Sequence, residues 1–241
     1  MTKPRIAIVP GDPAGIGPEL IAKLLGEDGV LDAANILLIG DSHLWKRGAQ
    51  QADLEVPLYT IPEVDIAAQE GLSHLEMKTI VSNDVKISEV TVEGGTTSLR
   101  CLDKALDLAQ LELVDGVLFA PFNKSSMTSA GLNAEDEHKY MARYLGFKGY
   151  HSEINVLDEL MTTRVTSHIG IRNVAKKINQ EGVKRAVNLA NDTLHRAGNM
   201  RPRIAVAALN PHAGDNGKFG REEIDILEPV IKSFQELQMN V

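Results

Sequence analysis

The sequence has a single cysteine and few aromatic residues, and each shortage excludes a class of protein. Of 241 residues, 1 is cysteine and 4 % are aromatic. A lone cysteine, Cys101, cannot form an intrachain disulfide, so the chain is not a disulfide-stapled scaffold and suits a reducing compartment. Because Cys101 lies on an apolar stripe with helical spacing, we expect it to be a core residue rather than a nucleophile.

The chain also lacks an excess of positive charge and a long hydrophobic run. Acidic residues outnumber lysine and arginine by 33 to 25, and the formal net charge is −8. This balance argues against a binder of nucleic acid or acidic membranes, although it allows a local phosphate site. The apolar run near the amino terminus is too short for a signal peptide, and no stretch is long enough to cross a bilayer. We therefore expect a soluble, cytoplasmic protein.

Short apolar runs alternate with longer amphipathic stretches. Five runs rich in Ile, Val and Leu are typical of buried strands: Arg5–Val9, Asn35–Ile39, Gly116–Ala120, Thr163–Thr166 and Ile204–Leu209. Apolar residues recur at helical spacing in residues 99–113, 183–194 and 224–237. This alternation predicts an α/β fold with a mostly parallel sheet. We place two lobes at residues 1–125 and 126–241.

Four of the predicted strands run into loops rich in glycine, proline and polar residues. These loops read GDPAGIGPE after Val9, APFNKSS after Phe119, SHIGIRN after Thr166 and NPHAGDNG after Leu209. In an open parallel sheet, ligands bind where the carboxyl ends of the strands meet. We therefore expect the four loops to line one cleft.

The first two loops supply the candidate catalytic residues, Asp12 and Lys124. The glycines of GDPAGIGPE either expose backbone N–H groups to an anion or only permit a tight strand–helix turn. Their spacing is not that of a dinucleotide fingerprint, so no cofactor-binding residue is assigned. Lys124 directly follows a strand, where it could neutralise a phosphate or carboxylate or assist proton transfer. The alternative is an ordinary exposed lysine.

Two of the seven histidines share a context. His168 and His212 each follow an apolar run and lie in a loop that contains glycine. Two imidazoles brought together at strand ends could bind a divalent transition metal, with a third ligand from elsewhere. The alternative is two unrelated loop histidines. His138, in EDEHKYMARYLG, has the acidic, helical surroundings of a solvated helix face.

Taken together, four motifs resemble the 4-hydroxythreonine-4-phosphate dehydrogenase family, in order and across nearly the whole chain. They are GDPAGIGPE, VDGVLFAPFNKSSMTSAG, TSHIGIRNV and LNPHAGDNGKFGREE. The resemblance implies a two-lobed α/β/α enzyme, related to the isocitrate and isopropylmalate dehydrogenases, with its site in the cleft between the lobes. It also implies a homodimer, NAD or NADP, and a divalent metal, with zinc as first choice and magnesium or cobalt as alternatives. His168 and His212 match the family's metal-binding histidines.

The activity implied is metal-dependent oxidation, with decarboxylation, of a phosphorylated hydroxy acid such as 4-hydroxythreonine 4-phosphate. The sequence departs from the family where Gly-His-Thr-Glu, whose His and Thr contact the substrate, is expected. Here the residues are Glu137-His138-Lys139-Tyr140. His138 and Lys139 are the predicted substrate-binding residues, and a cation in place of a hydroxyl predicts a different acid or phosphate.

A second departure concerns the third metal histidine, which the family carries in a later His-Asp motif. We expect this chain to be truncated at its carboxyl end, before that motif. The alternatives for function are a paralogue that acts on a sugar-acid phosphate or an aromatic cis-dihydrodiol acid, a metal-dependent hydrolase or lyase, and a non-catalytic truncated binding protein.

Overall fold

The structure, a computed structural model, describes residues 3–80, 85–134 and 136–241. The chain divides into two compact units, Met1–Lys148 and Gly149–Val241, and each is described by itself. The predicted boundary after residue 125 is therefore too early. The reason is that α5 (Lys124–Ser129) packs against α4 (Val92–Gln110) of the first unit. A Cβ on Gly95 of α4 would lie only 2.0 Å from the carbonyl oxygen of Ser126, so the two helices touch closely.

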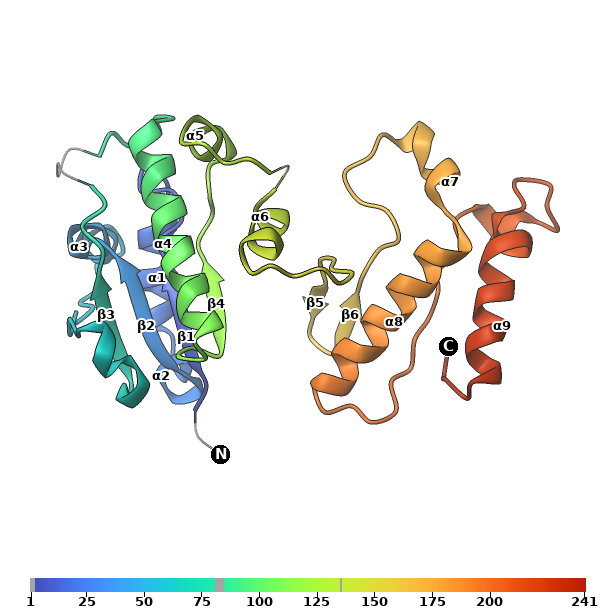
Figure 1. Ribbon diagram of the computed structural model, residues 1–241, viewed down its shortest axis with the longest axis horizontal. Helices are drawn as coiled ribbons and strands as arrows, with labels where there is room; N and C mark the ends of the chain where they lie inside the picture. The colour runs from blue at the N-terminus through green and yellow to red at the C-terminus, as the bar shows by residue number, and fades with distance from the viewer. Residues whose placement is uncertain (1–2, 81–84, 135) are drawn as a thin grey trace. The chain divides into compact units, whose positions relative to one another are not determined.

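The first unit is an α/β/α arrangement around a parallel four-stranded sheet (Figure 1). The strand order is β3 (Leu72–Glu76), β2 (Asn35–Gly40), β1 (Arg5–Val9), β4 (Gly116–Phe119), and all neighbours are parallel. β1, β2 and β4 confirm the predicted strands, whereas β3 was not predicted. The remaining helical elements are α1 (Gly17–Gly26), α2 (Val30–Ala33), α3 (Ser42–Gln51), η1 (Glu63–Ala68) and α6 (Glu137–Tyr144).

Alternate side chains of the strands face two different helix layers. Val9 packs with Cys101 of α4 on one face of the sheet, and Ile8 packs with Ile21 of α1 and Trp45 of α3 on the other. Each fully buried side chain of this size contributes about 1.5–3 kcal/mol to stability. Cys101 is completely buried, and burial raises the pKa of its thiol, which confirms the predicted core position. In the residues that the structure describes, no helix is long and apolar enough to cross a membrane.

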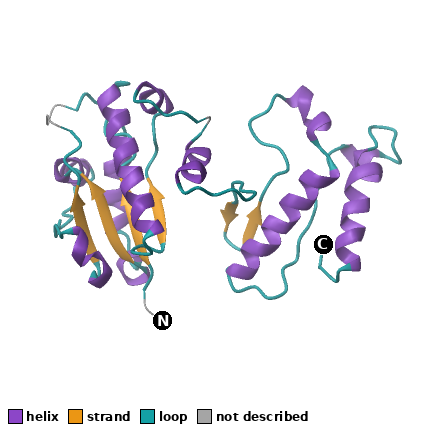
Figure 2. Ribbon diagram, in the orientation of Figure 1, coloured by secondary structure: helices purple, strands orange, loops and turns teal. Residues whose placement is uncertain are grey.

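The second unit is built around two packed helices (Figure 2). The long helix α8 (Gln180–Arg196) packs against α9 (Glu228–Glu236) and the π-helical turn η4 (Glu223–Leu227). Their shared core consists of Val183, Val187, Leu227, Val230 and Phe234. The other elements are the hairpin β5 (Asn155–Leu157)–β6 (Leu160–Thr162), η2 (Ile171–Asn173), α7 (Val174–Lys177) and η3 (Pro211–Gly214).

Two strands predicted in this unit, Thr163–Thr166 and Ile204–Leu209, are wrong: both stretches are drawn as loops in Figure 2. A strand needs a neighbour to pair with its backbone groups. The N–H of Ile204 donates instead to the carbonyl of Asn240, at 2.9 Å. Apolar side chains of both stretches pack against the core of α8 and α9, among them Val165 and Val206. The apolar character of the two runs therefore reflects packing on helices.

Candidate functional site

The carboxyl edge of the first sheet has the geometry of a ligand site. β2 and β3 lie on one side of β1, and β4 lies on the other, which makes the gap between β1 and β4 a topological switch point. Ligands of open α/β sheets bind outside the carboxyl ends of the strands at such a point. The loops after β1 and β4 meet there, since the N–H of Asp12 donates to the carbonyl of Pro121 at 3.0 Å. The predicted convergence is confirmed for these two loops. The other two loops belong to the second unit.

The glycines of the first loop permit its tight backbone path. Gly11 has a φ of +71°, and a Cβ there would lie 2.4 Å from the carbonyl oxygen of Pro121. A Cβ on Gly17 would lie 1.9 Å from the carbonyl oxygen of Pro10. Asp12 is buried, and its Oδ1 accepts the N–H of Ala14 at 2.9 Å. Asp12 therefore stabilises the turn, and its catalytic role stays a prediction.

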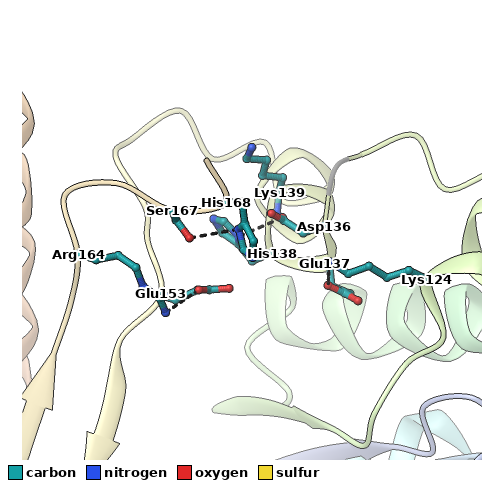
Figure 3. Close-up of polar contacts among 9 residues, drawn as sticks. All are labelled: Lys124, Asp136, Glu137, His138, Lys139, Glu153, Arg164, Ser167 and His168. Carbon is teal, nitrogen blue, oxygen red and sulfur yellow. Dashed lines mark hydrogen bonds and ion pairs between the residues drawn. The ribbon is translucent and has the colours of Figure 1, made fainter. Parts of the chain in front are cut away.

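Lys124 is the first residue of α5, at the carboxyl edge of the sheet (Figure 3). Asn123 caps this helix, because its Oδ1 accepts the N–H of Ser126 at 3.1 Å. The Lys124 ammonium lies 3.9 Å from the Oε2 of Glu137 on α6, and its side chain is 57 % exposed. The lysine is more than half exposed and the contact is long, so it contributes little to stability, and the Lys124 ammonium can exchange it for a ligand anion.

Asp136 organises the start of α6. Its Oδ1 accepts the backbone N–H of Lys139 at 2.9 Å, which caps the helix, and lies 3.0 Å from the Nδ1 of His138 (Figure 3). Burial raises the pKa of the Asp136 carboxyl, but the Lys139 N–H and the nearby cations outweigh burial and hold it below its usual range. The carboxylate is therefore ionised at neutral pH. The predicted residues Lys124, His138 and Lys139 thus come together around the first turn of α6.

Two tyrosines fix α6 to α4. The hydroxyl of Tyr140 donates to the Oδ1 of Asp103 at 2.6 Å, and that of Tyr144 donates to the Oδ1 of Asp107 at 2.8 Å. The two tyrosines are four residues apart in α6, and the two aspartates are four residues apart in α4. Each pair therefore lies on one face of its helix. Burial raises the pKa of Asp103 despite the hydrogen bond from Tyr140. These hydrogen bonds set the orientation of α6.

The first unit has a cavity of about 210 Å³ beside the loop after β1, which the sequence did not indicate. Pro13 of that loop lines it together with residues before and within the start of α4, among them Lys86, Thr91 and Gly94. A larger cavity, of about 580 Å³, lies at the amino edge of the sheet, beside Arg5. The smaller cavity is the better candidate because ligands of open α/β sheets bind at the carboxyl edge.

The loop that carries His212 is left-handed over six consecutive residues. Residues 212–217 all have φ values between +46° and +89°. The N–H of Asp215 donates to the carbonyl of His212 at 3.1 Å, as in a helical turn. Glycine, asparagine, aspartate and histidine tolerate this conformation better than other residues. The turn-forming residues of NPHAGDNG are therefore explained by this backbone, and Ala213 is the exception.

Glu223 anchors the approach to this loop. Its Oε1 accepts the N–H groups of Leu209 at 2.9 Å and Asn210 at 2.7 Å, and its Oε2 accepts the side-chain amide of Asn210 at 2.8 Å. Glu223 is buried. The hydrogen bonds from the side chain and backbone of Asn210 hold the pKa of Glu223 below its usual range. In the sequence analysis, Glu223 is only part of the motif that ends in GKFGREE, and no role is assigned to it.

The two predicted metal histidines share an unusual backbone. His168 and His212 have φ values of +54° and +52°. Residues other than glycine rarely adopt such values, and those that do are often found at functional sites. Both are exposed, and the Nδ1 of His168 lies 3.1 Å from the Oγ of Ser167. A structural or catalytic site for zinc requires at least three protein ligands. Residues 3–80, 85–134 and 136–241 contain no group of three His, Cys, Asp or Glu side chains that could hold a metal ion. The donor set is therefore incomplete.

Comparison with known proteins gives matches along the whole chain. The model of the family described as pyridoxal phosphate biosynthetic protein PdxA matches residues 32–241. A Pseudomonas aeruginosa protein named "Putative 4-hydroxythreonine-4-phosphate dehydrogenase 2" is 44 % identical over 236 residues, which cover 97 % of this chain and 70 % of that protein. A D-threonate 4-phosphate dehydrogenase of Salmonella typhimurium is 34 % identical over 244 residues, which cover 100 % of this chain and 74 % of that protein. The crystal structure of a 4-hydroxythreonine-4-phosphate dehydrogenase from Klebsiella pneumoniae matches with a TM-score of 0.88 at 29 % identity, and covers 100 % of this chain and 73 % of that one.

Proposed function

Because the chain belongs to the PdxA family, whose members compared above are named dehydrogenases, we propose that it oxidises a phosphorylated hydroxy acid with NAD. The observation that carries the proposal is the family match across both units, combined with the cluster of Lys124, His138 and Lys139 at the start of α6. The first candidate substrate is 4-hydroxythreonine 4-phosphate.

The reaction requires a substrate whose secondary hydroxyl group is on the carbon β to the carboxylate. The carbinol C–H bond breaks as a hydride, which NAD accepts when bound, and the hydroxyl proton passes to a base. The product is a β-keto acid, which loses carbon dioxide readily. Lys124 supports this sequence by neutralising a carboxylate or phosphate, or by assisting proton transfer. His138 and Lys139 bind the substrate from the first turn of α6.

A second candidate, D-threonate 4-phosphate, is favoured by Lys139. This acid carries a hydroxyl where 4-hydroxythreonine 4-phosphate carries an ammonium group. A lysine ammonium repels a substrate ammonium and accommodates a hydroxyl, so Lys139 shifts preference toward the sugar acid. The name of the Salmonella typhimurium relative supports this candidate.

We extend the proposal to a divalent-metal site that includes His168 and His212, with zinc as the first choice. Two imidazoles supply only part of the three or four ligands that such a site needs, so no step of the reaction is derived through the metal here. We further propose, from the family resemblance, that the protein is a cytoplasmic homodimer. NADP is the alternative to NAD.

The test is a substrate panel with the protein expressed from its complete reading frame. We expect NADH and carbon dioxide to form in equal amounts with at least one of 4-hydroxythreonine 4-phosphate and D-threonate 4-phosphate. A matched reaction with NADP identifies the preferred cofactor. Hydrolysis or elimination of either substrate without any change in NAD would overturn the proposal.

A further inference from the structure

We propose that Glu137 is a specificity-determining residue, which leads the Lys124 ammonium to bind the carboxylate of the substrate rather than its doubly charged phosphate. This inference rests on the proposed function and deepens it, because it decides which end of the substrate Lys124 contacts. It also gives Glu137 a role, which the sequence analysis does not.

Glu137 and Lys124 face each other from the first residues of α6 and α5 (Figure 3). The Nζ of Lys124 lies 3.9 Å from the Oε2 of Glu137. The lysine side chain is 57 % exposed, whereas the glutamate side chain is only 20 % exposed. The carboxylate is therefore the more confined partner, and a ligand that reaches the Lys124 ammonium meets Glu137 as well.

The helix that carries Glu137 is fixed. Tyr140 and Tyr144 of α6 donate to Asp103 and Asp107 of α4 at 2.6 Å and 2.8 Å. The free backbone N–H groups in the first turn of a helix also stabilise a negative charge there. The carboxylate of Glu137 is thus held beside Lys124 by the position of its helix.

Asp136 adds a second negative charge near Lys124. Its side chain is only 8 % exposed. Burial raises the pKa of the Asp136 carboxyl, but the N–H of Lys139 and the nearby cations, Lys124 among them, hold it below its usual range. In Figure 3 the side chain of Lys139 points away from Glu137 and Lys124. One ammonium therefore lies near two carboxylates.

This balance of charges disfavours a dianion at Lys124. The energy of a ligand in the field of nearby charges grows in proportion to its own charge. A lone lysine would thus attract a phosphate more strongly than a carboxylate. Beside two carboxylates the local charge is negative, so a second negative charge on the ligand is opposed. A phosphate monoester, whose second pKa is about 6, carries this second charge at neutral pH, and a carboxylate does not.

The test is the binding of two probe anions, methyl phosphate and acetate, to the protein expressed from its complete reading frame. NMR titration at about pH 8 follows the backbone amide signals of Asn123 and Glu137, which flank the Lys124 ammonium. We expect Glu137→Gln to bind methyl phosphate about 10-fold and acetate about 3-fold more tightly than the unmodified protein does. The first change is about the square of the second because the dianion is relieved of twice the repulsion.

The matched control is Glu63→Gln, which removes the same charge from another ion pair, 2.9 Å from Lys104. Glu63 belongs to η1, whose residues line the cavity at the amino edge of the sheet, so this variant should change neither affinity. Lys124→Gln should lose the binding of both anions at these amides.

Equal fold-changes for the two anions in Glu137→Gln would overturn the inference, as would the absence of binding in both proteins or full binding to Lys124→Gln. Because the titration needs no turnover, its result is separate from that of the substrate panel. An inactive protein with the expected affinities would refute the proposed function alone, and an active protein with equal fold-changes would refute only the role of Glu137.

Discussion

Glu223 and Asn210 form a double hydrogen bond, in which one carboxylate receives both the backbone N–H and the side-chain amide of the same residue, at 2.7 Å and 2.8 Å. This pair joins the start of η4 to the segment that leads into the left-handed loop of His212. The pair therefore constrains the backbone that leads to His212.

We expect Glu223→Gln to destabilise the protein by about 1–3 kcal/mol, because one carboxylate oxygen is replaced by an amide NH₂ group, which faces a donor of Asn210 and cannot accept its hydrogen bond. Urea unfolding measures the change. Glu222→Gln is the matched control, since Glu222 also accepts the Asn210 amide, at 2.8 Å, but is less buried. Equal losses in the two variants would contradict the role of Glu223.

Stability is expected to depend on pH through the same carboxylate. The pKa of Glu223 lies below its ordinary value of 4.5 because of the hydrogen bonds from Asn210. A carboxyl with a lowered folded pKa contributes stability that is complete above the unfolded pKa and is lost as pH falls through the folded pKa. The stability difference between the unmodified protein and Glu223→Gln should therefore stay constant from about pH 7 to 5.5 and shrink below pH 4.5. A difference that stays constant down to about pH 3 would show that the carboxylate charge is not involved.

The tyrosines of α6 should differ in their contribution to stability. Tyr140→Phe leaves the half-buried Asp103 without its donor and should cost about 1–2 kcal/mol. Tyr144 is 36 % exposed, so water can replace its hydroxyl and Tyr144→Phe should cost less. Thermal unfolding of both variants measures this order. The reverse order would mean that Asp103 does not depend on Tyr140.

Lys139 should control the choice between the two candidate substrates. We expect Lys139→Thr to raise kcat/KM for 4-hydroxythreonine 4-phosphate relative to D-threonate 4-phosphate, by about 10-fold for a change of 1.4 kcal/mol. Lys148→Thr is a control that removes a similar charge from the exposed end of the first unit. If the ratio is the same in the unmodified protein and in Lys139→Thr, Lys139 does not contact the substrate.

His168 and His212 should each contribute to zinc binding. We expect calorimetry to show weak zinc binding to the unmodified protein. His168→Ala and His212→Ala should each weaken it further, because each substitution removes one of the two imidazole ligands. His195→Ala, on the exposed end of α8, should leave binding unchanged. Affinities that are the same in all four proteins would rule out this pair as metal ligands.

The sequence predicts the first unit well because β1 and β2 bury apolar side chains on both faces of the sheet. β1, β2 and β4 read as continuous apolar runs, as strands of a parallel sheet do. β3 has the polar sequence LSHLE, and His74 within it is buried only because Thr60 and the carbonyl of Gly40 satisfy both ring nitrogens. Such tertiary hydrogen bonds leave no pattern in the sequence.

The second unit was harder to predict because an apolar run does not specify its partner. Val206 looks like part of a buried strand, yet it packs against helices and has no paired neighbour in the ranges that the structure describes. The site shows the same limit. Lys124 and His138 were identified from their motifs, whereas Glu223 acts through contacts that form only when separate segments meet.

The central claim, oxidation of a phosphorylated hydroxy acid, is tested most directly by comparing substrates with and without the phosphate. The measurement is the rate of NADH formation with D-threonate 4-phosphate and 4-hydroxythreonine 4-phosphate, each against its unphosphorylated counterpart. Our account predicts NAD reduction with a phosphorylated acid. It also predicts a kcat/KM about 10- to 100-fold lower without the phosphate, since a charge-assisted contact to phosphate contributes about 1.5–3 kcal/mol. Equal rates with and without the phosphate, or no NADH from either phosphorylated acid, would contradict it.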